Sequence, residues 1–158
     1  MTFIVFLIFA IAIVVADQRT KLWGVAQIPL YSQVEALDGL FHLTYVRNFG
    51  AAFSSFQGMR WVFVVLFVLL TAALLYEYFK KPMPFNTFER WCLAAIWGGG
   101  LGNVIDRVRL GYVVDMIEVE FITFPVFNVA DCFITCGCIA LMVSLILFNK
   151  GFWKEDKK

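Results

Sequence analysis

The stretch WVFVVLFVLLTAALLYEYF, residues 61–79, is interrupted by only one charged side chain, Glu77, near its end. A helix that crosses a membrane needs about 20 mostly apolar residues, because a rise of about 1.5 Å per residue must span about 30 Å of hydrocarbon. This stretch therefore predicts a transmembrane helix, and with it a fold built in a membrane.

The composition of the whole chain agrees with a membrane protein. Of its 158 residues, 61% are apolar and 16% are charged, against roughly 45–50% and roughly 25% in soluble domains. The formal net charge of +1 excludes nucleic-acid binding, which depends on a strongly basic surface. The length favours one compact domain over residues 1–158, without a large soluble part.

Three further stretches complete a predicted bundle of four transmembrane helices, at about residues 2–22, 91–108 and 129–148. The first could instead be a cleaved signal peptide. However, no Lys or Arg precedes it, whereas a signal peptide begins with a basic region. We therefore expect it to be retained as a helix.

Basic residues near the helix ends predict the orientation, because cytoplasmic loops are rich in Lys and Arg. Those that favour cytoplasmic termini are Lys80, Lys81, Arg90, Lys150, Lys154, Lys157 and Lys158. The connections at about 24–60 and 109–127 would then lie outside. Alternating residues at 41–46 and the turn-type pair Asp38-Gly39 predict short strands there, hence a small extracytoplasmic β-like platform.

Three carboxylates lie near the predicted outer membrane boundary: Asp106, Asp115 and Asp131. A carboxylate at such a boundary must be hydrated, paired or protonated, so it indicates a functional site. Two carboxylates in close approach share a proton, and such a pair can activate water and protonate a carbonyl oxygen. This is aspartic peptidase chemistry. The spacing does not decide whether Asp106 or Asp115 is the partner of Asp131.

Each of these acids also has a purely structural interpretation. Asp106 could form an ion pair with the adjacent Arg107, with Asn103 as a hydrogen-bonding neighbour on the same helix face. Asp115 could be a carboxylate of a surface loop. Asp131 could be an acidic residue stabilised by the dipole of the helix that it begins.

Other residues in these segments are typical of structural roles. Asn128 is suited to an N-cap, and Asp17 and Lys21 have the spacing of a helical ion pair. The glycines of residues 98–102 would allow a neighbouring helix to approach closely. The cysteines are interpreted as small buried residues, and no metal or other cofactor is predicted; they are Cys92, Cys132, Cys136 and Cys138.

Five motifs, taken together and in order, identify a family. They are DQRTK at 17–21, RNFGAAFS at 47–54, GNVIDR at 102–107, GYVVD at 111–115 and FPVFNVAD at 124–131. With them, the chain resembles bacterial lipoprotein signal peptidase, or signal peptidase II, over nearly its whole length.

The resemblance implies an intramembrane aspartic endopeptidase that uses no cofactor. Its substrates would be prolipoproteins bearing diacylglyceryl-cysteine, cut just before that cysteine among the membrane lipids. It implies the bacterial cytoplasmic (inner) membrane, with both termini cytoplasmic and the active site toward the outer face. It also makes Asp115 and Asp131 the catalytic pair. The residues implied to bind substrate or support the site are Asp17, Lys21, Asn48, Gly50, Asn103, Asp106, Arg107 and Asn128.

Two other classes of protein are compatible with parts of the pattern. A small proton-coupled transporter would also place carboxylates in helices, but it normally has repeats or broken helices near the bilayer midplane. A membrane scaffold without catalytic activity would explain the bundle but not the acids and asparagines near one boundary. Cleavage of a lipidated precursor would distinguish these classes from a peptidase.

Overall fold

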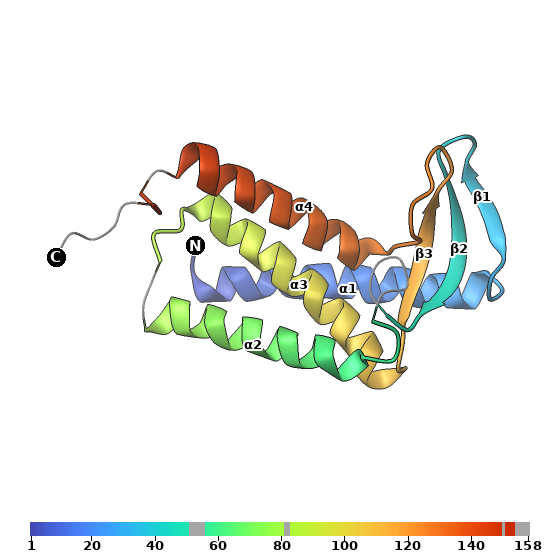
Figure 1. Ribbon diagram of the computed structural model, residues 1–158, viewed down its shortest axis with the longest axis horizontal. Coiled ribbons are helices and arrows are strands. Elements are labelled where there is room, and N and C mark those ends of the chain that lie inside the picture. The colour runs from blue at the N-terminus through green and yellow to red at the C-terminus, as the bar shows by residue number, and fades with distance from the viewer. Residues whose placement is uncertain (51–55, 81–82, 150, 154–158) are drawn as a thin grey trace.

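The computed structural model describes residues 1–50, 56–80, 83–149 and 151–153. It is a helical bundle with a small β-sheet at one end (Figure 1). Its helices are α1 (Phe3–Gln27), α2 (Arg60–Phe79), α3 (Thr87–Arg109) and α4 (Val129–Val143), which continues into a short π-helix, η2 (Ser144–Phe148).

Three helices in the described part of the chain are long and apolar enough to cross a membrane: α1, α2, and α4 together with η2. Helix α2 is the most apolar of them, with a mean hydropathy of 2.3, and Glu77 is its one buried residue among many exposed large apolar side chains. A helix that is apolar on all sides is suited to a lipid environment. The structure therefore supports an integral membrane protein.

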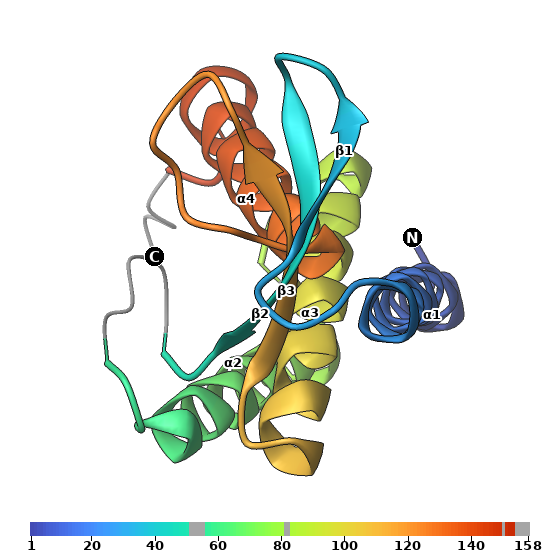
Figure 2. The same ribbon diagram turned by 90° about the vertical axis from the view of Figure 1, so that its right-hand side faces the viewer.

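Helix α3 lies at the centre of the bundle and contacts α1, α2 and α4 (Figure 2). Two of its glycines make this possible. A Cβ atom on Gly98 would lie 2.8 Å from the backbone oxygen of Ala10 on α1, and one on Gly99 would lie 2.5 Å from that of Ala130 on α4. The expectation that these glycines permit close approach is confirmed. Because its neighbours cover it, α3 can carry more polar residues than they do.

The strands form one antiparallel sheet in the order β1 (Gln33–Leu37), β2 (Phe41–Asn48) and β3 (Val113–Val119). The turn between β1 and β2 contains Asp38-Gly39, and Gly39 has the positive φ of 71° that glycine tolerates. The prediction of short strands in this region is confirmed. A bridge between Ile117 and Phe127 ties the segment before α4 to the sheet.

The N-terminus, the connection from α2 to α3 and the end of η2 lie together at the end of the bundle opposite the sheet (Figure 1). Lys80, which caps α2, and Arg90, in the first turns of α3, belong to this end. The other lysines that favour a cytoplasmic location, Lys81, Lys150, Lys154, Lys157 and Lys158, lie outside the described residues.

The same end is held by a buried carboxylate. Asn86 and Glu89 form a reciprocal capping box, so α3 begins at Thr87 rather than near residue 91. The Glu89 side chain is fully buried and accepts hydrogen bonds from Ser144 Oγ at 2.8 Å and Asn149 Nδ2 at 2.7 Å. These bonds connect the start of α3 to the end of the last helix.

Candidate active site

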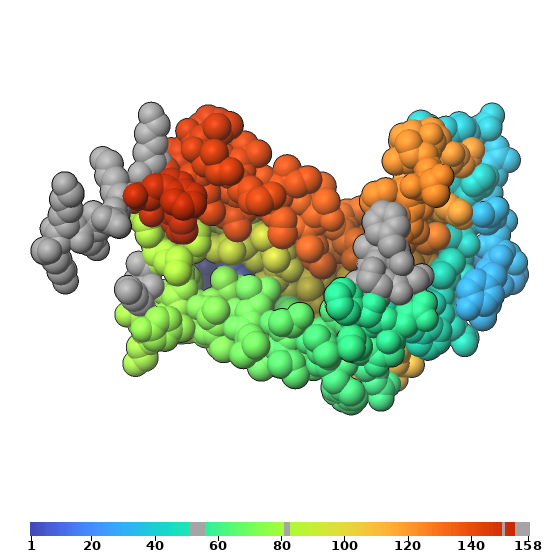
Figure 3. Space-filling model, in the orientation of Figure 1, coloured from blue at the N-terminus to red at the C-terminus, as the bar shows by residue number. Residues whose placement is uncertain are grey.

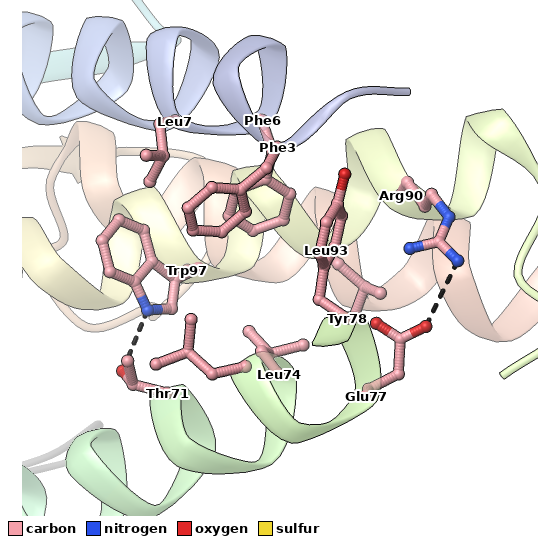
Figure 4. A pocket seen from close by; sticks show the side chains of 11 residues that line it. Phe3, Phe6, Leu7, Thr71, Leu74, Glu77, Tyr78, Arg90, Leu93 and Trp97 are labelled. Atoms are coloured by element: carbon pink, nitrogen blue, oxygen red, sulfur yellow. Dashed lines mark hydrogen bonds and ion pairs between the residues drawn. The ribbon is translucent and has the colours of Figure 1, made fainter. Parts of the chain in front are cut away.

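Two cavities in the bundle differ in the chemistry that they offer. The first lies among α1, α2 and α3 and encloses about 470 Å³ with its open mouth included (Figure 4). Its lining is almost entirely apolar and aromatic. Its polar side chains already have partners: Arg90 donates to Glu77 at 3.2 Å, Trp97 donates to Thr71 at 2.9 Å, and Tyr78 donates to the Met1 carbonyl at 3.4 Å. Among the described residues that line it, the one acid, Glu77, is paired with Arg90.

The second cavity is a cleft bordered by α2, α3, α4 and β3, and it encloses about 1530 Å³ with its open mouth included. It opens between α2 and α4, where the surface is recessed (Figure 3). Both Asp115 and Asp131 line it. The other walls are mainly apolar, with Phe63 and Phe67 from α2. An extended apolar chain could therefore lie against two carboxylates.

Asp115 lies on β3, and only 2% of its surface is exposed. Its Oδ2 accepts a hydrogen bond from Asn48 Nδ2 at 2.8 Å and its Oδ1 accepts one from Asn128 Nδ2 at 2.7 Å. Burial, together with the nearby charge of Asp131, raises the pKa of Asp115 from 3.8 to about 7, although both amide donors and Lys21 oppose the rise. A carboxyl group of this kind can hold a proton at neutral pH.

Asp131 lies in the first turn of α4, where Asn128 is the N-cap. The two residues form a capping box: Asn128 Oδ1 accepts from the Asp131 amide at 3.0 Å, and Asp131 Oδ2 accepts from the Asn128 amide at 3.1 Å. The expected N-cap is confirmed. Because Asn128 also bonds Asp115, this cap places the start of α4 beside β3.

Asn103, on α3, connects Asp131 to a second group of buried charges. Its Nδ2 donates to Asp131 Oδ1 at 2.8 Å, whereas its Oδ1 accepts from Lys21 Nζ at 2.8 Å and from Asn128 Nδ2 at 3.1 Å. A continuous polar network therefore runs from α1 through α3 to α4 and β3.

Lys21 forms ion pairs with Asp17 at 2.9 Å and with Asp106 at 3.0 Å, and all three side chains are buried. The ion pair of Asp17 and Lys21 was expected from their spacing and is confirmed. An ion pair between Asp106 and Arg107 was also expected, but this prediction is wrong. Adjacent helical residues point about 100° apart, so the two side chains leave α3 toward different neighbours.

Arg107 instead contacts backbone oxygens. Its guanidinium donates to the carbonyl of Asn103 at 3.3 Å and to that of Gly50 at 2.9 Å, and it lies 4.5 Å from the ring centre of Phe63. Gly50 in turn donates to Asn48 Oδ1 at 2.9 Å. These contacts hold the end of β2 against α3. The rest of this motif, residues 51–54, lies outside the described residues.

Gln18 also belongs to this network, although it is not among the site residues predicted from the sequence. Its Nε2 donates to Asp106 Oδ1 at 2.9 Å, and also to Asp17 and to the carbonyl of Gly102 at 3.2 Å. Its position next to Asp17 in a motif was the available signal. The Ala130 amide donates a hydrogen bond to Asp17 Oδ1 at 3.0 Å, and no pattern in the sequence predicts this bond.

The cysteines occupy less uniform positions than expected. Cys92 is buried within the protein, whereas Cys132 and Cys138 are partly exposed and Cys136 is exposed on α4, a helix apolar enough to cross a membrane. The difference arises because α4 turns much of its surface outward. Cys132 and Cys136 line the cleft. Among the described residues, no group of three or more His, Cys, Asp or Glu side chains is arranged to hold a metal ion.

Comparison with known proteins assigns the chain to a family. The model of the family Signal peptidase (SPase) II matches residues 9–147, which include every residue of the polar network. The chain belongs to the signal peptidase II family. It is 42% identical over 151 residues to the lipoprotein signal peptidase of Streptococcus agalactiae serotype Ia, covering 94% of this chain and 92% of the relative.

Other members and solved structures agree. A lipoprotein signal peptidase of Streptococcus thermophilus is 43% identical over 146 residues, with 92% of this chain and 90% of the relative covered. A structure described as a bacterial membrane enzyme at 2.3 Å resolution superposes with a TM-score of 0.86 at 29% identity, covering 99% of this chain and 94% of that one. As a signal peptidase II family member, the chain is a membrane-integral protease.

Proposed function

We propose that this member of the signal peptidase II family is an aspartic endopeptidase in which Asp115 and Asp131 are the catalytic residues. The observation that carries the proposal is that these two carboxylates, from β3 and α4, line one cleft and are joined through Asn128. The relatives are named for the processing of lipoproteins, which supports prolipoprotein signal peptides as the substrates.

Asp115 is the member of the pair that holds the proton at neutral pH, because burial raises its pKa to about 7. Asp131 accepts a proton from water as that water attacks the scissile carbonyl carbon, and Asp115 gives its proton to the carbonyl oxygen. The tetrahedral intermediate breaks its C–N bond when Asp131 protonates the nitrogen and Asp115 takes back a hydroxyl proton. Turnover should therefore decrease as the pH rises above about 7.

The surrounding polar residues hold this pair in place. Asn48 and Asn128 position the carboxylate of Asp115, and Asn103 positions that of Asp131. We assign the positioning of the substrate backbone to Arg107, a cation that lines the cleft. The residues assigned to the support of these elements are Asp17, Lys21, Gly50 and Asp106.

The apolar walls of the cleft support a substrate that remains in the bilayer. Burial of each CH₂ group is worth about 0.8 kcal/mol, so withdrawing a two-chain lipid from the membrane would be very costly. We therefore propose that the substrate bears diacylglyceryl-cysteine and is cut just before that residue. Phe63 and Phe67 would then contact the apolar signal sequence or lipid.

We further propose that α3 is a fourth membrane-spanning helix, since its 23 residues extend about 34 Å. The protein would reside in the bacterial cytoplasmic membrane with both termini in the cytoplasm. The sheet and the catalytic pair would then lie toward the outer face. The grouping of the N-terminus and the end of η2 at the end opposite the sheet supports this orientation.

The decisive experiment is a cleavage assay with the purified enzyme and a prolipoprotein, offered with and without its diacylglyceryl group. The lipidated precursor should be cut and the other should not. Asp115→Asn and Asp131→Asn should each abolish cleavage but remain folded, whereas Asp38→Asn, in the exposed turn of the sheet, should cleave normally. Substantial turnover by Asp115→Asn would exclude the proposed pair.

A further inference from the structure

Lys21 is placed to do more than neutralise acids. Its ammonium group has three N–H donors and no acceptor, and it has three partners: Asp17 Oδ2, Asp106 Oδ2 and Asn103 Oδ1. The two carboxylates would be sufficient partners for one positive charge. The third donor is directed at a neutral side chain that itself contacts the proposed catalytic Asp131.

That third contact determines which way the Asn103 amide faces. The two ends of an asparagine amide have nearly the same shape, but an ammonium group can bond only to the oxygen. With Oδ1 held by Lys21, the NH₂ group faces Asp131 Oδ1. The reversed amide would set its NH₂ against the ammonium and its oxygen against the Asp131 carboxylate, which is unfavourable at both ends.

Asn128 favours the same orientation, but less strongly. Its Nδ2 donates to Asn103 Oδ1 at 3.1 Å and is shared with the carbonyl of Val114 and with Asp115 Oδ1. The bond from Lys21 is shorter, at 2.8 Å, and is charge-assisted. Lys21 is therefore the stronger of the two constraints on the Asn103 amide.

We propose that Lys21 is a positioning residue for catalysis: by fixing the Asn103 amide, it keeps an N–H donor directed at Asp131 Oδ1, so that Asp131 is held in place as the base. This inference rests on the proposed function. It separates Lys21 from Asp17 and Asp106, whose part is to stabilise the buried ammonium and the elements around it. Asp17 also accepts from the Ala130 amide, and Asp106 from that of Val114.

The test removes all three charges at once, because deletion of Lys21 alone would leave two buried acids without a cation. The triple variant Asp17→Asn/Lys21→Met/Asp106→Asn retains one acceptor oxygen at each of positions 17 and 106 and buries no unpaired charge. We expect it to unfold within a few degrees of the wild type and to keep KM within about two-fold, with kcat lowered by about ten-fold or more. A purely structural ion triad predicts an unchanged kcat.

A double-mutant cycle tests whether Lys21 acts on Asp131 through the Asn103 amide. In an Asn103→Leu background, adding the three substitutions should change kcat by less than about two-fold, because the constrained amide is already absent. An undiminished loss in that background, or wild-type kcat in the triple variant, would overturn the proposal. If the triple variant does not fold, Lys21→Met/Asp106→Asn replaces it, since that variant keeps the net charge of the cluster and the bond to Ala130.

Failure of both variants to fold would make Lys21 a folding residue and also overturn the proposal. The outcome remains distinct from failure of the proposed function. If Asp115→Asn is inactive and the triple variant is fully active, only the role of Lys21 is wrong. If Asp115→Asn cleaves substrate, the catalytic assignment itself is wrong.

Discussion

Nδ2 of Asn128 lies 2.7 Å from Oδ1 of Asp115 and donates a hydrogen bond to it, although Asn128 is also the residue that caps α4. One fully buried side chain thus stabilises the beginning of a helix and holds a carboxylate on a neighbouring strand. Since Asp131 belongs to the same capping box, the separation of the proposed catalytic pair depends on this asparagine.

Substitution of Asn128 should therefore affect turnover and stability together. Asn128→Ala removes the cap, which costs about 1 kcal/mol, and it leaves Asp115 with one amide donor. We expect kcat to decrease by about 100-fold. Asn86→Ala is the matched control, because it removes the N-cap of a similar capping box at the start of α3, at the end of the bundle opposite the sheet. It should lower the melting temperature with little change in kcat, and equal losses of kcat in both variants would contradict this role.

Asp106 should contribute to stability through Lys21 and not through Arg107. Asp106→Asn breaks a buried ion pair, so we expect the free energy of unfolding to decrease by about 3 kcal/mol. Thermal unfolding in detergent measures this, with Asp38→Asn as an exposed control. Arg107→Gln should not lower the free energy of unfolding by breaking an ion pair with Asp106, because the two side chains do not form one. A double-mutant cycle between Asp106 and Arg107 should give near-zero coupling, and a large coupling would restore the rejected pair.

The buried carboxyl of Asp115 should make stability depend on pH. Its pKa is about 7 in the folded protein against 3.8 for an ordinary aspartate. Between these values the folded state binds more protons than the unfolded state, so its contribution to the free energy of unfolding decreases as the pH rises from about 4 to about 7. Measurement of the free energy of unfolding of the wild type and of Asp115→Asn over this pH range tests the prediction. The free energy of unfolding of the wild type, relative to that of Asp115→Asn, should decrease as the pH rises. Parallel pH profiles of the two proteins would show that Asp115 titrates normally.

Neither cysteine chemistry nor a metal should be required. The variant with Cys92, Cys132, Cys136 and Cys138 all replaced by Ala or Ser should keep most of its activity, and EDTA should have no effect. Cys132 carries the greatest risk, because it follows Asp131 and lines the cleft. The cleavage assay with and without chelator measures this. Inhibition by EDTA that zinc reverses would mean that the carboxylates bind a metal.

The orientation in the membrane can be tested with reporters. Because the N-terminus and the end of η2 lie opposite the sheet, a reporter fused after Lys158 should be cytoplasmic. One inserted near Asp38 should be on the outer side. A C-terminal reporter found outside would contradict both the four-span arrangement and the position of the active site.

The sequence alone determined much of this protein. Long apolar runs such as residues 61–79 set the helices, because a chain in lipid must satisfy its own backbone hydrogen bonds. Asn128 and Asp131 could be recognised as an N-cap and an acid of the first helical turn, since both interactions act over three residues. The short strands followed from alternation and the turn at Asp38-Gly39.

Only the tertiary structure decided which polar groups meet. Asp106 is adjacent to Arg107 in sequence but pairs with Lys21, 85 residues away, because close approach at Gly98 brings α1 against that face of α3. Asp115 likewise obtains its amide partners from β2 and from the start of α4. Spacing along the chain reports neighbours within a helix, whereas the geometry between helices depends on packing that no local pattern encodes.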